Sequence, residues 1–319
     1  MNKGVIPLFL LLGLATWFFY PGLFEGKSLV HGDNLNLGLP LLDLHQKIFS
    51  EGATATWSNL IYGGHPLCAE SQGGFSNPLN NIAVLLFEPV HANMVLRWLA
   101  TILTALGVYQ LCRILSASPL AAGFAALAAC FSAIFIRMNT NLTATEALAF
   151  IPWMMWSMEY WLKKPGYKTA LYFGLCAAMM VFAGYPQFMH GTVVYLFASL
   201  LVIPFQTDER NRIRQNFSLY VKTGICAVLI AVSISAIQWL PLVELVNHSH
   251  RQEGTDVLLP LAPEIFIRGL LFSSFVQPSP FITYFPVVSS VFLCFIASLV
   301  VVAKSPSRLK GHMIGAILL

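Results

Sequence analysis

The chain has 319 residues, of which 57% are hydrophobic and 10% are charged, and its formal net charge is +4. Such a composition favours a polytopic membrane protein over a water-soluble domain. The small net charge lies mainly on alternate loops, which indicates membrane orientation and excludes nucleic acid as a partner. We predict an all-α membrane protein that forms a single transmembrane domain over residues 1–319.

Eight apolar runs are each long enough to form a complete transmembrane helix. They lie near residues 5–24, 91–112, 118–136, 146–162, 168–185, 188–206, 219–241 and 286–303. A ninth run begins at Met313 and stops at Leu319, which at about 1.5 Å per residue is too short to cross a core of about 30 Å. We therefore expect a truncated ninth helix in the N-terminal part of a longer protein.

The loops between these runs alternate in charge. Lysine and arginine gather near Lys3, Arg113, residues 163–168, 210–222 and 304–310. Because cytoplasmic loops carry the excess of these residues, this side faces the cytoplasm, and so does the N-terminus. The first extracytoplasmic loop is then residues 25–90, and the last is residues 242–285.

The first outer loop is expected to be folded rather than flexible. Paired glycines and Asn-Pro are typical of turns, and an ordered loop of this length usually has a function. Pro40 suits the first turn of a short helix in the membrane interface. The apolar residues of that helix are Leu37, Leu41, Leu42, Leu44, Ile48 and Phe49, and they alternate with Asp43, His45, Gln46 and Lys47.

The loop opens with His31-Gly32-Asp33-Asn34, directly after the first span. An acid at this position can deprotonate an acceptor hydroxyl, or it can bind a divalent cation that neutralises a phosphate leaving group. The alternative is that Asp33 caps the interfacial helix or anchors a turn. We expect His31, Asn34, Trp57 and His65 to line a pocket for the acceptor.

Two further candidates lie between the third and fourth spans. Glu146 begins the fourth span and is either a second catalytic carboxylate that faces Asp33 or an ordinary acid favoured by the helix dipole. Arg137, at the end of the third span, either binds the phosphate of a lipid donor or extends to the headgroups.

The later outer segments add three candidates. Gln187 follows the tight turn of residues 184–187, and Gln238 lies near the outer end of the seventh span; both are expected in the acceptor pocket. Arg251 is a candidate phosphate contact for the donor. Its neighbours His248 and His250 form a His-x-His pair without a clear third metal ligand, so the cofactor stays open between none and a divalent cation.

The order of several short motifs resembles the bacterial YfhO-type membrane proteins. The motifs are Gly32-Asp33, Pro40, Trp57, Gly63-Gly64, Pro66, Asn77-Pro78, Ala183-Gly184-Tyr185-Pro186-Gln187 and Gln238-Trp239-Leu240-Pro241 with Glu244 and Arg251. That family is similar to the GT-C superfamily of integral membrane glycosyltransferases, which use polyprenyl-phosphate sugars outside the cytoplasm and keep an essential acid in the first outer loop. By this resemblance Asp33 takes that position, and the fold is GT-C-like.

The resemblance implies a protein of the bacterial inner (cytoplasmic) membrane. Its implied partners are membrane lipid, a polyprenyl-phosphate sugar donor and a cell-envelope glycan or glycolipid acceptor. One departure matters: many members carry a second acid two residues after the first, whereas Leu35 stands here. A metal site with two carboxylates in this loop is therefore not expected.

We predict a membrane glycosyltransferase in which Asp33 activates the acceptor and Arg137 or Arg251 stabilises the departing phosphate. The alternatives are a lipid or solute transporter, or flippase, and a non-catalytic membrane scaffold. Against a transporter, the spans hold few charged residues, and no pair of Gly/Pro-broken spans occupies matching positions in two halves.

Overall fold

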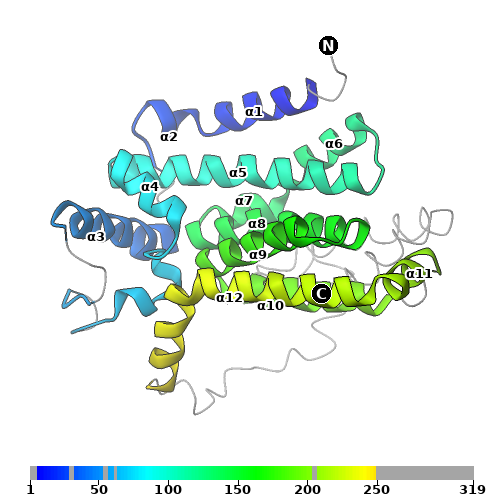
Figure 1. Cartoon of the computed structure of the whole chain (residues 1–319). Coiled ribbons are helices and arrows are strands. Elements are labelled where there is room, and N and C mark those ends of the chain that lie inside the picture. The colour runs from blue at the N-terminus through cyan, green and yellow to red at the C-terminus, as the bar shows by residue number, and fades with distance from the viewer. Residues whose placement is uncertain (1–5, 29–31, 53–56, 61–62, 203–206, 249–319) are drawn as a thin grey trace, which may run out of the picture.

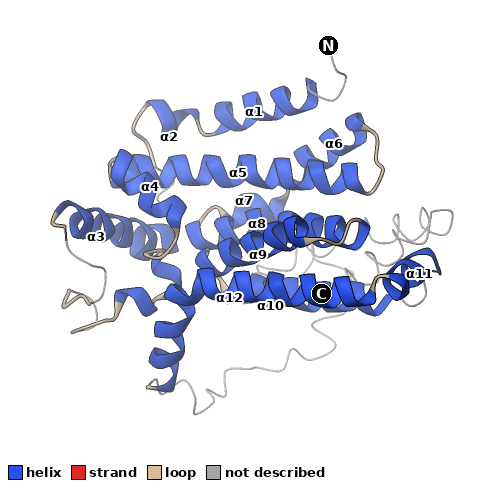
Figure 2. Ribbon diagram, in the orientation of Figure 1, coloured by secondary structure: helices blue, strands red, loops and turns tan. Residues whose placement is uncertain are grey.

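The computed structural model describes residues 6–28, 32–52, 57–60, 63–202 and 207–248. Across these ranges all regular elements are helices, as Figure 2 shows, and extended backbone pairs in an isolated antiparallel bridge between Ser58 and His65. The prediction of an all-α fold is confirmed for this part of the chain. The predicted span at 286–303, the truncated ninth helix, His31 and Arg251 lie outside the described residues.

The predicted apolar runs up to residue 241 are helical. Helices α1 (Ile6–Phe18) and α2 (Tyr20–Phe24) form the first run, and α5 (Pro89–Ile114) forms the second. The following helices are α6 (Pro119–Cys130), α7 (Ala133–Met138), α8 (Leu142–Lys163), α9 (Tyr167–Phe182), α10 (Pro186–Val202), α11 (Thr207–Gln215) and α12 (Phe217–Asn247). Within the described ranges, α5 and α12 are long and apolar enough to cross a membrane.

Three boundaries differ from the prediction. The run at 5–24 breaks between α1 and α2, next to Pro21, which has no backbone N–H to donate. The run at 118–136 breaks because Ser132 caps α7, its hydroxyl accepting from the Phe135 amide at 3.3 Å. Helix α12 continues through Pro241 into the predicted last loop, 242–285, and bends near its end (Figure 1).

The long helices lie side by side in a layered bundle (Figure 1). Helix α5 packs against α1, α6 and α8, and α9 packs against both α8 and α12. Gly107 of α5 lets the helices approach closely, since a Cβ there would lie 2.9 Å from Pro152 and Trp153 of α8. The largest buried cluster lies between α8, α9, α10 and α12 and includes Met154, Met158, Met180 and Tyr195.

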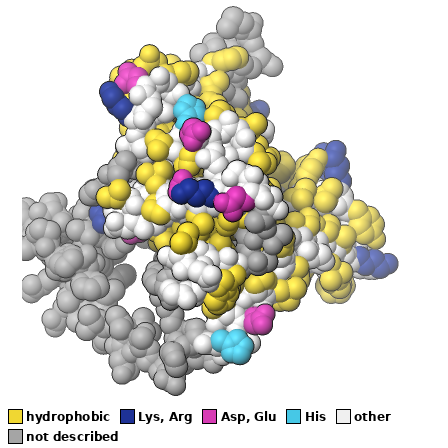
Figure 3. All heavy atoms as spheres, turned by 90° about the vertical axis from the view of Figure 1, so that its left-hand side faces the viewer, with side chains coloured by type: hydrophobic (Ala, Val, Ile, Leu, Met, Phe, Trp, Pro, Cys, Tyr) yellow, Lys and Arg dark blue, Asp and Glu magenta, His cyan; other side chains and the backbone are white. Residues whose placement is uncertain are grey.

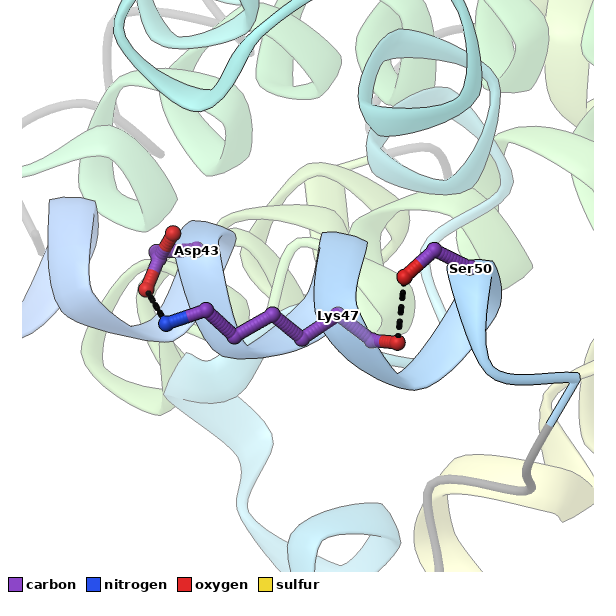
Figure 4. A network of polar contacts seen from close by, with 3 residues as sticks. All are labelled: Asp43, Lys47 and Ser50. Carbon is purple, nitrogen blue, oxygen red and sulfur yellow. Dashed lines mark hydrogen bonds and ion pairs between the residues drawn. The ribbon is translucent and has the colours of Figure 1, made fainter.

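The predicted first outer loop, residues 25–90, contains several short helices in its described part. After a π-helical turn η1 (Asn34–Gly38) it forms α3 (Leu39–Ser50), the 3₁₀ turns η2 (Leu67–Ala69) and η3 (Ser71–Gly73), and α4 (Pro78–Leu86). Leu41, Leu42 and His45 form the buried face of α3. Its exposed face carries the Lys47–Asp43 ion pair at 2.6 Å, and the Ser50 hydroxyl donates to the Lys47 carbonyl (Figure 4).

Burial also fixes the protonation state of His45. Its ring packs between Phe49 and Phe75, with ring centroids 5.1 and 4.7 Å away. Removal from solvent lowers the pKa of the imidazole from 6.5 to about 4. When the side-chain amide of Asn81 is oriented with its nitrogen towards the ring, that nitrogen donates to His45 Nε2 at 2.9 Å. Only an unprotonated Nε2 can accept this hydrogen bond, so the contact suits the neutral imidazole.

The loop covers one end of the bundle, where α5, α8 and α10 begin and α9 and α12 end (Figure 1). Helices α3 and α4 pack on α5, and η2 packs on α12. The Gln46 amide crosses from α3 to the end of α4, donating to the carbonyls of Val84 at 3.1 Å and Phe87 at 3.0 Å. The candidate residues at the head of the loop are thereby held against the bundle.

Candidate functional site

Asp33 lies at the start of η1 with its carboxylate exposed. Asn141, which is 108 residues away in the sequence, donates a hydrogen bond from Nδ2 to Asp33 Oδ2 at 3.3 Å. Asn141 is also the N-cap of α8, where its Oδ1 accepts from the Ala144 amide at 3.2 Å. The Asp33 carboxylate is therefore held beside the positive end of the α8 dipole while it stays open to solvent.

The alternative that Asp33 caps a helix is wrong, and the alternative that it anchors a turn stays a prediction. Its side chain makes no capping hydrogen bond at η1, and α3 follows Gly38, again without a side-chain cap. Among the described residues its carboxylate accepts from Asn141, which leaves further acceptor positions for a ligand.

A narrow cleft opens beside Asp33. Its volume is about 20 Å³, which is space for roughly one water molecule. Any ligand larger than a water molecule therefore has to lie on the open side of the cleft, against the exposed Asp33 side chain. The lining residues come from four parts of the chain and include Asp33, Leu41, Gln72, Asn80, Asn141 and Thr143.

Asn34, next to Asp33, has the opposite environment and is fully buried. Its Oδ1 accepts from Asn93 Nδ2 at 2.9 Å and from Arg97 Nη2 at 2.8 Å. Arg97 Nε also donates to Asn93 Oδ1 at 2.8 Å. Asn34 was expected in an acceptor pocket, and the structure places it instead in a closed network with two polar residues of α5.

Glu146 is also buried, with 2% of its surface exposed. Its Oε2 accepts from Asn77 Nδ2 at 3.0 Å, and its charge interacts with that of Arg97. Glu146 lies in the second turn of α8, so the account that relied on the first-turn dipole is wrong. It lies near Asp33 in the fold but is enclosed by protein, so the two acids do not face each other across open solvent.

A larger cavity of about 380 Å³ lies on the other side of η3. Its walls are the turn between α9 and α10 and the outer half of α12, including Tyr185, Ser235, Gln238 and Trp239. Gln238 is 2% exposed, and neither its Oε1 nor its Nε2 has a hydrogen-bond partner in the described part of the chain. A buried amide in this state is a donor and an acceptor available to a ligand.

A second, apolar cavity of about 430 Å³ lies between α8, α9, α10 and α12. Ala231 and Val232 of α12 line both cavities, so the two are neighbours along α12.

The turn η3 lies between the cleft at Asp33 and the cavity at Gln238. Ser71 lines the cavity at Gln238, whereas Gln72 and Gly73 line the cleft at Asp33. Ser71 packs directly on Gly184, where a Cβ would lie 1.7 Å from the Ser71 carbonyl oxygen. The first outer loop and the turn between α9 and α10 are thus fitted together at this point.

Four other predicted residues are exposed or half-buried and do not line these cavities. Trp57 is exposed, and His65 pairs with Glu70 at 3.2 Å within the same loop. Gln187 is exposed at the start of α10. Arg137 is exposed at the end of α7, four residues before the Asn141 that contacts Asp33.

This end of the molecule has a mixed surface, on which acidic, basic and histidine side chains gather among hydrophobic ones (Figure 3). In the described ranges, His, Cys, Asp and Glu side chains form no group of three that could hold a metal ion. The described residues therefore do not supply the carboxylate pair or the histidine cluster that a divalent cation would need.

The sequence analysis missed Asn93 and Arg97. Their signal was present, because Asn93, Arg97, Thr101 and Thr104 share one face of α5 at helical spacing, and all four are buried. An ionisable residue inside an apolar run is a candidate functional residue by itself.

Comparison with known proteins found no matching protein-family profile, no similar curated protein and no similar solved structure. Functional inference for this chain therefore depends on the geometry of the site and on its sequence motifs.

Proposed function

We propose that the chain is an integral membrane glycosyltransferase, similar to YfhO-type and GT-C proteins, that uses a polyprenyl-phosphate sugar. Asp33 takes the proton from an acceptor hydroxyl, and the acceptor oxygen attacks the anomeric carbon of the donor sugar. The bond between that carbon and the phosphate oxygen breaks, and polyprenyl phosphate leaves. The acceptor is a glycan or glycolipid of the cell envelope.

The observation that carries this proposal is the state of Asp33. Its carboxylate is exposed, free of any capping role and held in one place by the Asn141 amide at 3.3 Å. A general base needs both access to the hydroxyl and a fixed position. Asp33 meets the two requirements together, whereas Glu146 is buried and does not.

The two neighbouring apolar cavities along α12 support a donor with a hydrocarbon chain. We assign the apolar cavities to the polyprenyl chain and Gln238 to a polar group near its head. Arg137, close in sequence to Asn141, is our phosphate ligand beside Asp33, and Arg251 remains a second candidate. The proposal allows a divalent cation on the donor phosphate but does not require one. Among the described residues, no group of three His, Cys, Asp or Glu side chains would hold it.

A membrane location is supported by the surface of α12. Ile225, Val228, Leu229 and Ile237 are each more than half exposed along a helix that could cross a bilayer. Basic residues mark the end of the bundle away from the first outer loop, at Arg113, Lys163 and the arginines of α11. We propose the bacterial inner membrane with this basic end in the cytoplasm.

The test is sugar transfer in proteoliposomes that hold the full-length protein. The donors are a panel of polyprenyl-phosphate sugars, and wild type is compared with Asp33→Asn, which keeps the size of the side chain and removes the base. We expect a loss of about 100-fold or more in transfer rate. Transfer that is unchanged in the variant would refute the role of Asp33, and a folded wild-type protein that transfers none of the sugars would refute the function.

One observation favours a transporter instead. Arg97 and Glu146 are buried ionisable residues on adjacent helices, α5 and α8, and intramembrane ionisable residues often mark transport pathways. Lipid or solute uptake in the same proteoliposomes separates the two functions, because a transporter would move its substrate without releasing polyprenyl phosphate. A scaffold would do neither.

A further inference from the structure

Arg97 is a cation inside the protein with no exposed surface. Burying a guanidinium is costly unless its charge and its N–H groups find partners. Among the described residues, Nε donates to Asn93 and Nη2 donates to Asn34, while Nη1 has no partner. Two of its three nitrogens are therefore directed to amide oxygens of a single small network.

That network joins the second apolar helix to the residue that follows Asp33. Arg97 Nη2 and Asn93 Nδ2 meet at one atom, Asn34 Oδ1, at 2.8 and 2.9 Å. Because a planar guanidinium and a planar amide approach this oxygen together, the Asn34 side chain has one favourable position. The backbone of Asn34 fixes the adjoining Asp33, since one peptide bond connects them.

Glu146 lies on the other side of the network and interacts electrostatically with Arg97. Its Oε2 accepts from Asn77, whose own Oδ1 caps α4 by accepting from the Leu79 amide at 3.0 Å. Helices α5, α8 and α4 and the head of the loop thereby meet around two buried ionisable side chains. The Asp33 carboxylate lies at the exposed edge of this arrangement, against Asn141 of α8.

We propose that Arg97 and Asn93 are positioning residues that act through Asn34 to hold the Asp33 carboxylate beside Asn141. The inference rests on the function proposed above and adds to it, because it assigns a role in transfer to residues that contact no substrate. We call the hydrogen bonds from Arg97 and Asn93 to Asn34 the clamp. Removal of the clamp lowers kcat for transfer by about 100-fold, which is the effect of displacing a reacting group by about 1 Å, and leaves the KM for the donor unchanged.

The test variant replaces both charges, as Arg97→Leu with Glu146→Leu. Removing Arg97 alone would leave Glu146 buried and unpaired and would destabilise the fold, whereas apolar replacement of a whole buried pair is often tolerated. The control is Thr101→Val, on the same buried face of α5, because the Thr101 hydroxyl donates to the Arg97 carbonyl within the helix.

The first readout does not depend on activity. Asp33→Cys and Asn141→Cys are combined in a background without the native cysteines, and a short bis-thiosulfonate reagent measures how readily the two positions are joined. We expect rapid cross-linking with intact Arg97 and with Thr101→Val, and at least a tenfold slower reaction in the double-leucine variant. Equal cross-linking in a double-leucine variant that unfolds at the wild-type temperature would overturn the clamp.

The second readout is the kinetics of transfer in the chain that retains Asp33 and Asn141. A fall in kcat with an unchanged donor KM supports positioning, and a rise in KM alone overturns it. Slower cross-linking together with no transfer by the wild-type protein would support the clamp as a positioning device and refute the glycosyltransferase. The two proposals thus fail separately.

Discussion

The substitution Gly184→Ala adds one methyl group and should disrupt the packing of the first outer loop on the bundle. Its φ is +71°, a conformation that costs a residue with a Cβ about 1–2 kcal/mol. A Cβ would also lie 1.7 Å from the Ser71 carbonyl oxygen, and because that atom is backbone, no rotamer change relieves the overlap. Overpacking of this kind adds about 1–3 kcal/mol, so Gly184→Ala should destabilise the protein by about 2–5 kcal/mol.

Gly26 provides a matched control for the backbone effect. Its φ is +68°, and a Cβ there would meet no atom within 4 Å. Gly26→Ala should therefore carry the conformational cost of about 1–2 kcal/mol without the steric one. The difference between the two variants isolates the packing of Ser71 on the turn between α9 and α10.

The assay is unfolding by SDS in mixed micelles, with protease cleavage of the loop at residues 67–73 as a local readout. We expect Gly184→Ala to unfold at lower SDS than Gly26→Ala and to expose the loop before the bundle unfolds. Equal destabilisation by the two substitutions, with equal cleavage, would refute the reasoning, because the position of the loop would then not depend on the packing of Ser71 against Gly184.

Two further predictions concern buried polar groups in the same region. Because burial lowers the pKa of His45 from 6.5 to about 4, its stabilising contribution is complete above pH 6.5 and is lost as the pH falls towards 4. The free energy of unfolding should therefore fall between pH 7 and pH 5 by about 2 kcal/mol more in wild type than in His45→Gln. Equal falls in the two proteins would contradict the burial of a neutral ring. Gln238→Met should stabilise the lipid-free protein by about 1–2 kcal/mol, since it removes an unpartnered amide, and should raise the KM for the donor; a lower stability would show that the amide is satisfied within the protein.

Much of the helical architecture could be predicted from the sequence because it depends on the length of apolar runs. The interfacial helix was also predictable, from the alternation of its residues and from Pro40, which occupies the first turn of α3. The break before α7 had a local signal in Ser132, whose preference for helix N-caps competes with the continuous apolar pattern. Signals of this kind can be recognised in the sequence of each helix separately, without knowledge of its neighbours in the fold.

The sequence identified Asp33 as a candidate but could not predict its surroundings. The position of an acid after the first apolar run is read locally, whereas its partner Asn141 is 108 residues away, and hydrophobic periodicity carries no information on such pairs. Gln238 was placed in a pocket from its motif, and it does line one, although that pocket is separated by η3 from the cleft at Asp33. The order of motifs along the chain does not determine which of them meet.

Asp33 and Asn34 are adjacent in the sequence but have contrasting environments. The π-helical turn η1 begins here, so that one residue is exposed to solvent and the next is enclosed against α5. The buried amide takes hydrogen bonds from Asn93 and Arg97, and these bonds are strong because they are shielded from water and one donor is charged. The exposed carboxylate needs only the Asn141 contact to complete its orientation. Asp33 thus provides solvent exposure and the adjacent Asn34 provides rigidity. A substitution that removes the hydrogen bonds of Asn34 should therefore make the Asp33 side chain more mobile.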